Sequence, residues 1–187
     1  MSRALRVQDP GSIYHVTAHG LDSRPIFRDD LDRQDFVVRL GRVVSTFAWR
    51  LYGVCLLETH LNLLVCVSAP NLGRGMQVVN GGHARAFNLR HRRRGALFES
   101  RYRDRRIADD SHLLTAIRYV ARNPVEAGVV DRPQDWVWST YGQLIGERAA
   151  WSCFSPAFVL AHFSPRPDTA LRIVREFVEG ARHPRGV

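Results

Sequence analysis

The sequence predicts an α/β (α+β) fold, a ferredoxin-like sandwich with a central, mainly antiparallel sheet, helices packed on it and a C-terminal helical extension. Its 187 residues, 45% of them hydrophobic and 24% charged, suit one compact domain with an appendage. Some segments have the short, β-branched composition of strands, and others repeat apolar residues at helical spacing. The predicted order is strand, helix, strand, strand, helix, strand, helix.

The first part of the chain is expected to contain three strands and one helix. Residues 12–17 are rich in β-branched and aromatic side chains between two glycines, which predicts a strand. Asp29 or Asp30 can cap a helix whose apolar residues recur at spacings of three and four up to Phe47. Residues 49–57 and 61–67 are apolar, and the polar residues between them predict a hairpin.

A second helix is expected from Asn71 to about Arg94, although two adjacent glycines weaken it. Gly95 then precedes a predicted strand over residues 96–107.

Asp110 or Ser111 is expected to cap a third helix that ends at Asn123, because Pro124 is expected to stop it. We expect residues 1–139 to form the main domain and residues 140–187 to form the extension, with an amphipathic helix over residues 170–180. Three aromatic residues near this boundary are interpreted as packing anchors. They are Trp136, Trp138 and Tyr141.

The chain is strongly basic, with 27 basic and 18 acidic residues and a net charge of +9. Every basic residue is arginine, and a planar guanidinium binds phosphate with two hydrogen bonds and stacks on bases. The charge therefore favours a nucleic-acid partner over a membrane, with an ordinary basic surface as the alternative.

Other classes of protein are excluded by the apolar and cysteine patterns. Cys55, Cys66 and Cys153 are too widely spaced for a disulfide framework or a cysteine-rich zinc site. The longest apolar run, over residues 54–67, is interrupted by polar residues and is too short to cross a bilayer. The N-terminus has no apolar signal region, so we expect a cytoplasmic protein.

Two pairs of polar residues are candidates for a site. Strand alternation places His60 and Asn62 on one face, where they could hold Mg²⁺ or Mn²⁺. Helical spacing places Tyr119 and Asn123 together on one flank of the third helix, outside its apolar stripe. If that flank faces the strand, a hydroxyl lies beside a metal site. The alternatives are a polar hairpin end and a surface tyrosine.

A cluster of eight arginines within seventeen residues, interleaved with aromatic residues, suits binding to single-stranded nucleic acid. A solvated, partly paired charged face is the alternative. The arginines are Arg90, Arg92, Arg93, Arg94, Arg101, Arg103, Arg105 and Arg106.

Taken together, several motifs resemble the REP-associated tyrosine transposases, a branch of the single-tyrosine HUH transposases. They are YHVTAHG, THLNLLV, GALFESRYRDRRI, IRYVARNPVEAGVV and WVWSTY, and they span about residues 11–145. The resemblance implies that Tyr119 attacks a DNA phosphodiester and forms a 5′-phosphotyrosine, with a divalent metal, Mg²⁺ or Mn²⁺, at the scissile phosphate. It also implies that His60 and Asn123 hold the metal, while Asn62 replaces the second histidine of the family's His-x-His motif.

The first hypothesis is thus a bacterial, nucleoid-associated DNA transposase, monomeric or homodimeric, acting on single-stranded DNA with hairpins. The second is a DNA-binding protein of the same fold that has lost catalysis through Asn62. An RNA-binding domain is the third, disfavoured because the strands carry no RNP-like aromatic motif. His15, on another strand, is interpreted as a core or sheet-surface histidine rather than a substitute ligand.

Overall fold

The computed structural model describes residues 8–180, so the predictions for the first and last seven residues concern parts of the chain outside it. Four strands form one sheet in the order β2-β3-β1-β4, and all neighbouring strands are antiparallel. The strands are β1 (Ile13–His19), β2 (Arg50–Leu56), β3 (His60–Cys66) and β4 (Arg103–Arg106). This order confirms the predicted ferredoxin-like sandwich with an antiparallel sheet.

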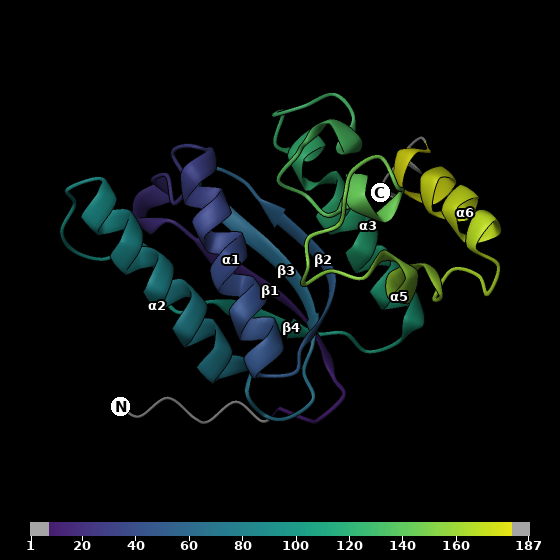
Figure 1. Ribbon diagram of the computed structural model, residues 1–187, viewed down its shortest axis with the longest axis horizontal. Helices are drawn as coiled ribbons and strands as arrows, with labels where there is room; N and C mark the ends of the chain where they lie inside the picture. Colours follow the sequence, from purple (N-terminus) through teal and green to yellow (C-terminus); the bar gives the residue numbers. More distant parts are fainter. Residues whose placement is uncertain (1–7, 181–187) are drawn as a thin grey trace, which may run out of the picture.

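Two long helices cover one face of the sheet. They are α1 (Asp30–Thr46) and α2 (Leu72–Arg90), which pack against each other (Figure 1). As predicted, an aspartate caps α1: the Asp29 side chain accepts a hydrogen bond from the backbone N–H of Asp32. The buried side chains of β1, namely Tyr14, Val16 and Ala18, alternate with more accessible ones. One side of the sheet therefore forms the main core.

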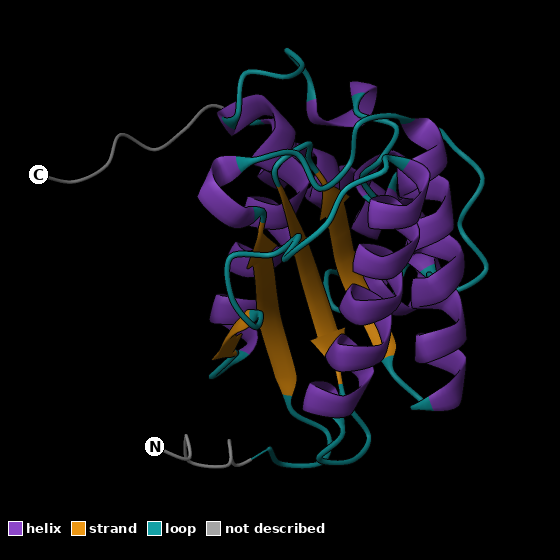
Figure 2. Cartoon of the chain, turned by 90° about the vertical axis from the view of Figure 1, so that its left-hand side faces the viewer, coloured by secondary structure: helices purple, strands orange, loops and turns teal. Residues whose placement is uncertain are grey.

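The third helix, α3 (Asp110–Glu126), lies on the opposite face over β2 and β3. Figure 2 shows the strands between two groups of helices. Gly53 of β2 permits this close approach, because an added Cβ would lie 3.3 Å from the Val120 side chain. Gly53 pairs with Leu64, which in turn pairs with His15 of β1, so His15 projects toward the α3 side of the sheet.

The C-terminal residues pack into the same hydrophobic core as the sheet. Trp138 donates a hydrogen bond to Asp30, and Tyr141 donates one to Glu179, so both aromatic residues are packing anchors as predicted. The short elements η1 (Leu21–Ser23), η2 (Pro133–Asp135), α4 (Tyr141–Leu144) and α5 (Pro156–Leu160) accompany the predicted amphipathic helix α6 (Pro167–Glu179). Within residues 8–180, no helix has the length and apolar character needed to cross a membrane.

Helix α3 is attached to the end of α6 by two arginines. Arg122 donates a hydrogen bond to the carbonyl of Val178 at 3.0 Å, and Arg118 donates one to the carbonyl of Gly180 at 3.3 Å. The Arg118 guanidinium also lies 5.5 Å from the ring centre of Phe177. These side chains satisfy carbonyl groups that a helix end otherwise leaves without partners.

Two predicted boundaries around the arginine-rich segment are wrong. Helix α2 ends at Arg90 rather than near Arg94, and Arg92 has a positive φ of 51° that the helix cannot accommodate. The strand expected over residues 96–107 is reduced to β4. The buried residues of the expected strand, Leu97, Tyr102 and Ile107, recur at every fifth position, which does not fit the alternation that a continuous strand requires.

The predicted limits of the third helix are also wrong. Its N-cap is Asp109, whose side chain accepts from the backbone N–H of His112 at 2.8 Å. The helix continues through Pro124 to Glu126. Pro124 is buried in the last turn, where packing compensates for the single hydrogen bond that its missing N–H removes.

Gly75 of α2 provides a stability test. A Cβ at this position would overlap the ring of Trp49, which is buried and donates a hydrogen bond to Asn71 at 2.7 Å. We expect Gly75→Ala to lower the free energy of unfolding by about 1–3 kcal/mol in urea titrations. Gly81→Ala in the same helix meets open space and should raise it by up to about 1 kcal/mol. Equal effects of the two substitutions would contradict this packing argument.

Candidate functional site

Tyr119 projects from α3 toward the part of the sheet that β1 forms. Its side chain is 48% exposed, and its ring meets the imidazole of His15 edge-on with the ring centres 5.4 Å apart. The following residue, Val120, is buried in the apolar stripe of the helix. The helix therefore holds a phenol on the molecular surface while the adjacent stripe fixes its backbone.

Asn123 lies one turn after Tyr119 and joins the helix to the start of β3. Its side-chain oxygen Oδ1 lies 3.2 Å from His60 Nε2 and accepts a hydrogen bond from Asn62 Nδ2 at 2.9 Å. Asn62 is only 1% exposed and Asn123 only 6%. Two buried amides and one imidazole thus meet beside Tyr119, so the four residues singled out in the sequence lie in one neighbourhood.

His15 extends this network onto β1. Its Nε2 lies 2.9 Å from Asn62 Oδ1, so the contacts run from His60 through Asn123 and Asn62 to His15. The sequence interpretation treated His15 as a core or sheet-surface histidine and gave it no role in the site. The signal that could have identified it is the alternation in YHVTAHG combined with the antiparallel pairing of the first and third strands.

Both histidines of the network are shifted toward the neutral form. Burial lowers the pKa of His15, although its hydrogen bond with Asn62 opposes the change. Burial and then the neighbouring His19 lower the pKa of His60, whose ring stacks on that of His19 with centres 5.0 Å apart. A neutral imidazole has one ring nitrogen with a free lone pair, so each ring can accept a hydrogen bond or bind a metal ion.

The donor set is compatible with a hard divalent cation. Ligands at about 2.1 Å in adjacent octahedral positions lie about 3 Å apart, which matches the 3.2 Å between His60 Nε2 and Asn123 Oδ1. Thr59 Oγ1 lies 3.3 Å from His60 Nδ1 and can accept a hydrogen bond from a proton on that nitrogen, which leaves Nε2 unprotonated and free to bind a cation.

The hydrogen-bonded side chains of the site are amides and imidazoles, which carry no negative charge. Among the described residues, no group of three or more histidine, cysteine, aspartate or glutamate side chains is placed to hold a metal ion. The available ligands near Asn123 are neutral amides and imidazoles. A cation would therefore depend on an anionic substrate, such as a phosphate, to complete and neutralise its shell.

The fold divides the arginine run between different surfaces. Arg103 and Arg105 of β4 pair with Thr17 and His15, so they lie on the same face of the sheet as the network. Arg106 projects to the other face and pairs with Asp9 at 2.9 Å. The remaining members follow or end α2. They are Arg90 at the helix end and Arg92, Arg93, Arg94 and Arg101 in the connection to β4.

Arg90 is occupied by ion pairs with the start of α1. Its guanidinium contacts both carboxylate oxygens of Asp29 at 2.7 Å and one oxygen of Asp32 at 2.6 Å. The hydrogen bonds from Arg90 lower the pKa of Asp29 to about 2. The geometry thus assigns Arg90 a structural contact between the two helices.

This ion pair predicts a specific pH dependence of stability. The pKa of Asp29 is lower in the folded state than in the unfolded chain. The contribution of this carboxylate to the free energy of unfolding is therefore complete above the unfolded pKa of about 4 and disappears as the pH falls toward 2. We expect Arg90→Gln to flatten the loss of unfolding free energy between pH 4 and pH 2 in urea titrations. Arg172→Gln, which removes an exposed pair with Glu176, should leave that slope unchanged.

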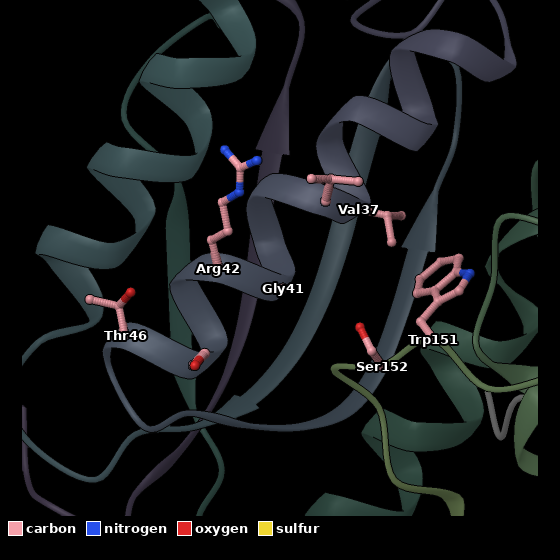
Figure 3. Close-up of a pocket in the computed structure, with 8 residues that line it drawn as sticks. Val37, Gly41, Arg42, Thr46, Trp151 and Ser152 are labelled. Atoms are coloured by element: carbon pink, nitrogen blue, oxygen red, sulfur yellow. The ribbon is translucent and has the colours of Figure 1, made fainter.

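A recess of about 570 Å³ lies away from this network, between α1 and the segment at residues 151–152. Trp151 and Ser152 flank one side, and Val37, Arg42 and Thr46 belong to the α1 side (Figure 3). The recess is open and its lining includes none of the predicted site residues. The side chains of the candidate site therefore lie on the sheet face beside α3 and not in this recess.

Comparison with known proteins shows similarity in the fold. No protein-family model matches the sequence, and the comparison with curated proteins gave no match. A solved structure of a REP-associated tyrosine transposase bound to a REP hairpin is similar over 83% of this chain and 90% of that chain. The TM-score is 0.65 and the sequence identity 14%. The two chains thus share an overall architecture.

Proposed function

We propose that this protein binds single-stranded or hairpin DNA and cleaves and rejoins it through Tyr119. The observation that carries the proposal is the placement of an exposed tyrosine one helical turn from Asn123, whose oxygen meets His60 and Asn62. This arrangement combines a nucleophile with polar groups suited to a phosphate and its counterion. The likeness to a transposase solved with a DNA hairpin supports the same class of partner.

In the proposed reaction, the Tyr119 oxygen forms a bond to the phosphorus of a DNA phosphodiester. The bond from phosphorus to the 3′ oxygen breaks, the phenol proton passes to solvent, and the leaving 3′ oxygen takes up a proton. The products are a 5′-phosphotyrosine and a free 3′-hydroxyl, and attack by a 3′-hydroxyl in the reverse direction rejoins the strand. A Mg²⁺ or Mn²⁺ ion held by His60, Asn62 and Asn123 would polarise the phosphate.

The sheet face beside Tyr119 is the proposed DNA surface. Helix α3 lies over β2 and β3, while His15 and Thr17 of β1 remain partly accessible and Arg103 and Arg105 of β4 are exposed. The arginines can neutralise the backbone of a strand whose phosphate reaches Tyr119.

The second candidate is a DNA-binding protein without strand transfer. It is favoured by one observation: Asn62 and Asn123 hydrogen-bond to each other and to the two histidines, which satisfies these buried amides without a metal ion. Such a protein would retain the basic sheet face and bind hairpins without cleaving them.

A single experiment separates the two candidates. The protein is incubated with 3′-end-labelled hairpin DNA from the flanks of its own gene, with Mg²⁺, with Mn²⁺ or with EDTA, and then analysed on a denaturing gel. Strand transfer yields a labelled band at the mass of the protein plus a DNA fragment, only when metal is present. Binding in a native gel without any such band supports the DNA-binding candidate.

The proposed surface also predicts how binding depends on salt. Each phosphate contact with single-stranded DNA contributes about −0.7 to the log–log slope of affinity against salt. We expect replacement of both Arg103 and Arg105 by alanine to make that slope less steep by about 1.4. Arg172→Ala on α6, a position distant in sequence from Arg103 and Arg105, should leave the salt slope unchanged. An unaltered slope in the double variant would place the DNA elsewhere on the molecule.

A further inference from the structure

The Asn62 amide has two different ends, and its surroundings determine which end faces the site. Its oxygen lies 2.9 Å from His15 Nε2, and its nitrogen donates to Asn123 Oδ1 at 2.9 Å. Because Asn62 is 1% exposed, neither end can exchange its partner for bulk water. In this orientation the site receives an NH₂ group from Asn62, which cannot bind a cation.

We propose that His15 is a positioning residue that sets the orientation of the Asn62 amide and thereby controls whether position 62 offers an oxygen to the site. When His15 Nε2 carries the proton, it donates to Asn62 Oδ1 and holds that oxygen toward β1. When the proton is on Nδ1, Nε2 accepts from the Asn62 NH₂ group, and the amide oxygen turns toward His60 and Asn123. This inference rests on the proposed function, because it concerns the same site.

The backbone keeps His15 in place for this role. It pairs with Leu64 of β3 on one side and with Arg105 of β4 on the other, so the strand cannot shift without breaking the sheet. The Tyr119 ring packs against the same imidazole. His15 therefore contacts both Tyr119, which is the proposed nucleophile, and Asn62.

A histidine at position 62 would depend less on this partner, since a neutral imidazole always keeps one unprotonated ring nitrogen that can bind a cation. Asparagine, in contrast, presents oxygen or NH₂ according to its neighbour. The dependence on His15 should consequently exist with asparagine at position 62 and be largely absent after Asn62→His. This difference allows a positioning role to be separated from a general effect on folding.

The test measures Mn²⁺ affinity by electron paramagnetic resonance, in the presence of hairpin DNA and in a Tyr119→Phe background that prevents strand transfer. We expect His15→Phe, which keeps an aromatic ring, to weaken Mn²⁺ binding at least about tenfold. In an Asn62→His background the same change should alter affinity by less than about threefold. His112→Phe removes a histidine that lies near His15 without a hydrogen bond to Asn62, and serves as the control.

A second readout follows the imidazole itself. In ¹⁵N-labelled protein with hairpin DNA, adding Mg²⁺ should move the His15 Nε2 signal from the N–H range to the range of an unprotonated ring nitrogen. A Nε2 that stays protonated at saturating Mg²⁺ would overturn the inference.

The outcomes distinguish this inference from the proposed function. Equal Mn²⁺ affinity of His15→Phe and its parent, with a covalent DNA adduct still formed by the protein carrying Tyr119, would refute the role of His15 alone. Absence of Mn²⁺ binding in the parent would refute both the metal centre and the positioning role. Melting curves by circular dichroism verify that each variant is folded.

Discussion

Tyr119→Phe is expected to abolish the covalent protein–DNA adduct while leaving hairpin affinity within about twofold of the unmodified protein. The substitution removes the attacking oxygen, and no other atom of the ring can replace it. It retains the aromatic ring that packs against His15, and the side chain is 48% exposed, so little packing is lost. Loss of adduct with retained binding is the signature of a nucleophile.

The measurement pairs a denaturing gel for the adduct with a native gel for binding, on the same labelled hairpin. Tyr52→Phe is the matched control, because it makes the same chemical change at a buried tyrosine that packs against Phe158 and His162 on another part of the molecule. This control should form the adduct at an unchanged rate. An adduct that persists in Tyr119→Phe would exclude Tyr119 as the nucleophile.

The second large effect is expected at His60. Removal of its imidazole by His60→Ala takes one ligand from the proposed cation and one contact from Asn123. We expect adduct formation to fall by more than about 100-fold, since even indirect partners of a metal commonly contribute 10- to 100-fold. His162→Ala, a histidine that packs against Tyr52 and Phe158, provides the control.

Asn62→His, in contrast to His60→Ala, is expected to raise the rate of adduct formation. Imidazole is a better ligand than an amide for Mn²⁺, so the rate of adduct formation should rise most with that ion. Because position 62 is 1% exposed, thermal melting must accompany the assay to verify that the larger ring is accommodated. Should neither the unmodified protein nor Asn62→His form an adduct with Mg²⁺ or Mn²⁺, the DNA-binding candidate replaces the enzyme.

The parts of the site that follow local periodicity could be predicted from the sequence. Alternation along a strand placed His60 and Asn62 on one face, and helical spacing placed Tyr119 and Asn123 on one flank. The sequence did not establish that the two pairs meet, because that contact joins segments about sixty residues apart. His15 had no assigned role for the same reason, since its partner lies 47 residues away on another strand.

The arginine run illustrates the opposite case, in which closeness in sequence does not mean closeness in space. Strand alternation sends Arg105 and Arg106 to opposite faces of the sheet. Arg90 pairs with Asp29, 61 residues earlier, a contact that no local pattern indicates. The boundary at Pro124 was wrong because a proline preference is local, whereas burial of the last turn of α3 is a tertiary effect.

The attachment of α3 to α6 has a consequence for the order in which the protein is made. Arg118 and Arg122 lie next to Tyr119 and Asn123 in sequence, and their carbonyl partners belong to residues 178 and 180. During translation the sheet and Tyr119 emerge before residues 178–180, so the support behind α3 is synthesised after α3 itself. A nascent chain that has not yet reached residue 178 thus carries Tyr119 and Asn123 on a helix that still lacks this anchor. Synthesis of α6 thus becomes the step that fixes the helix carrying Tyr119 in position.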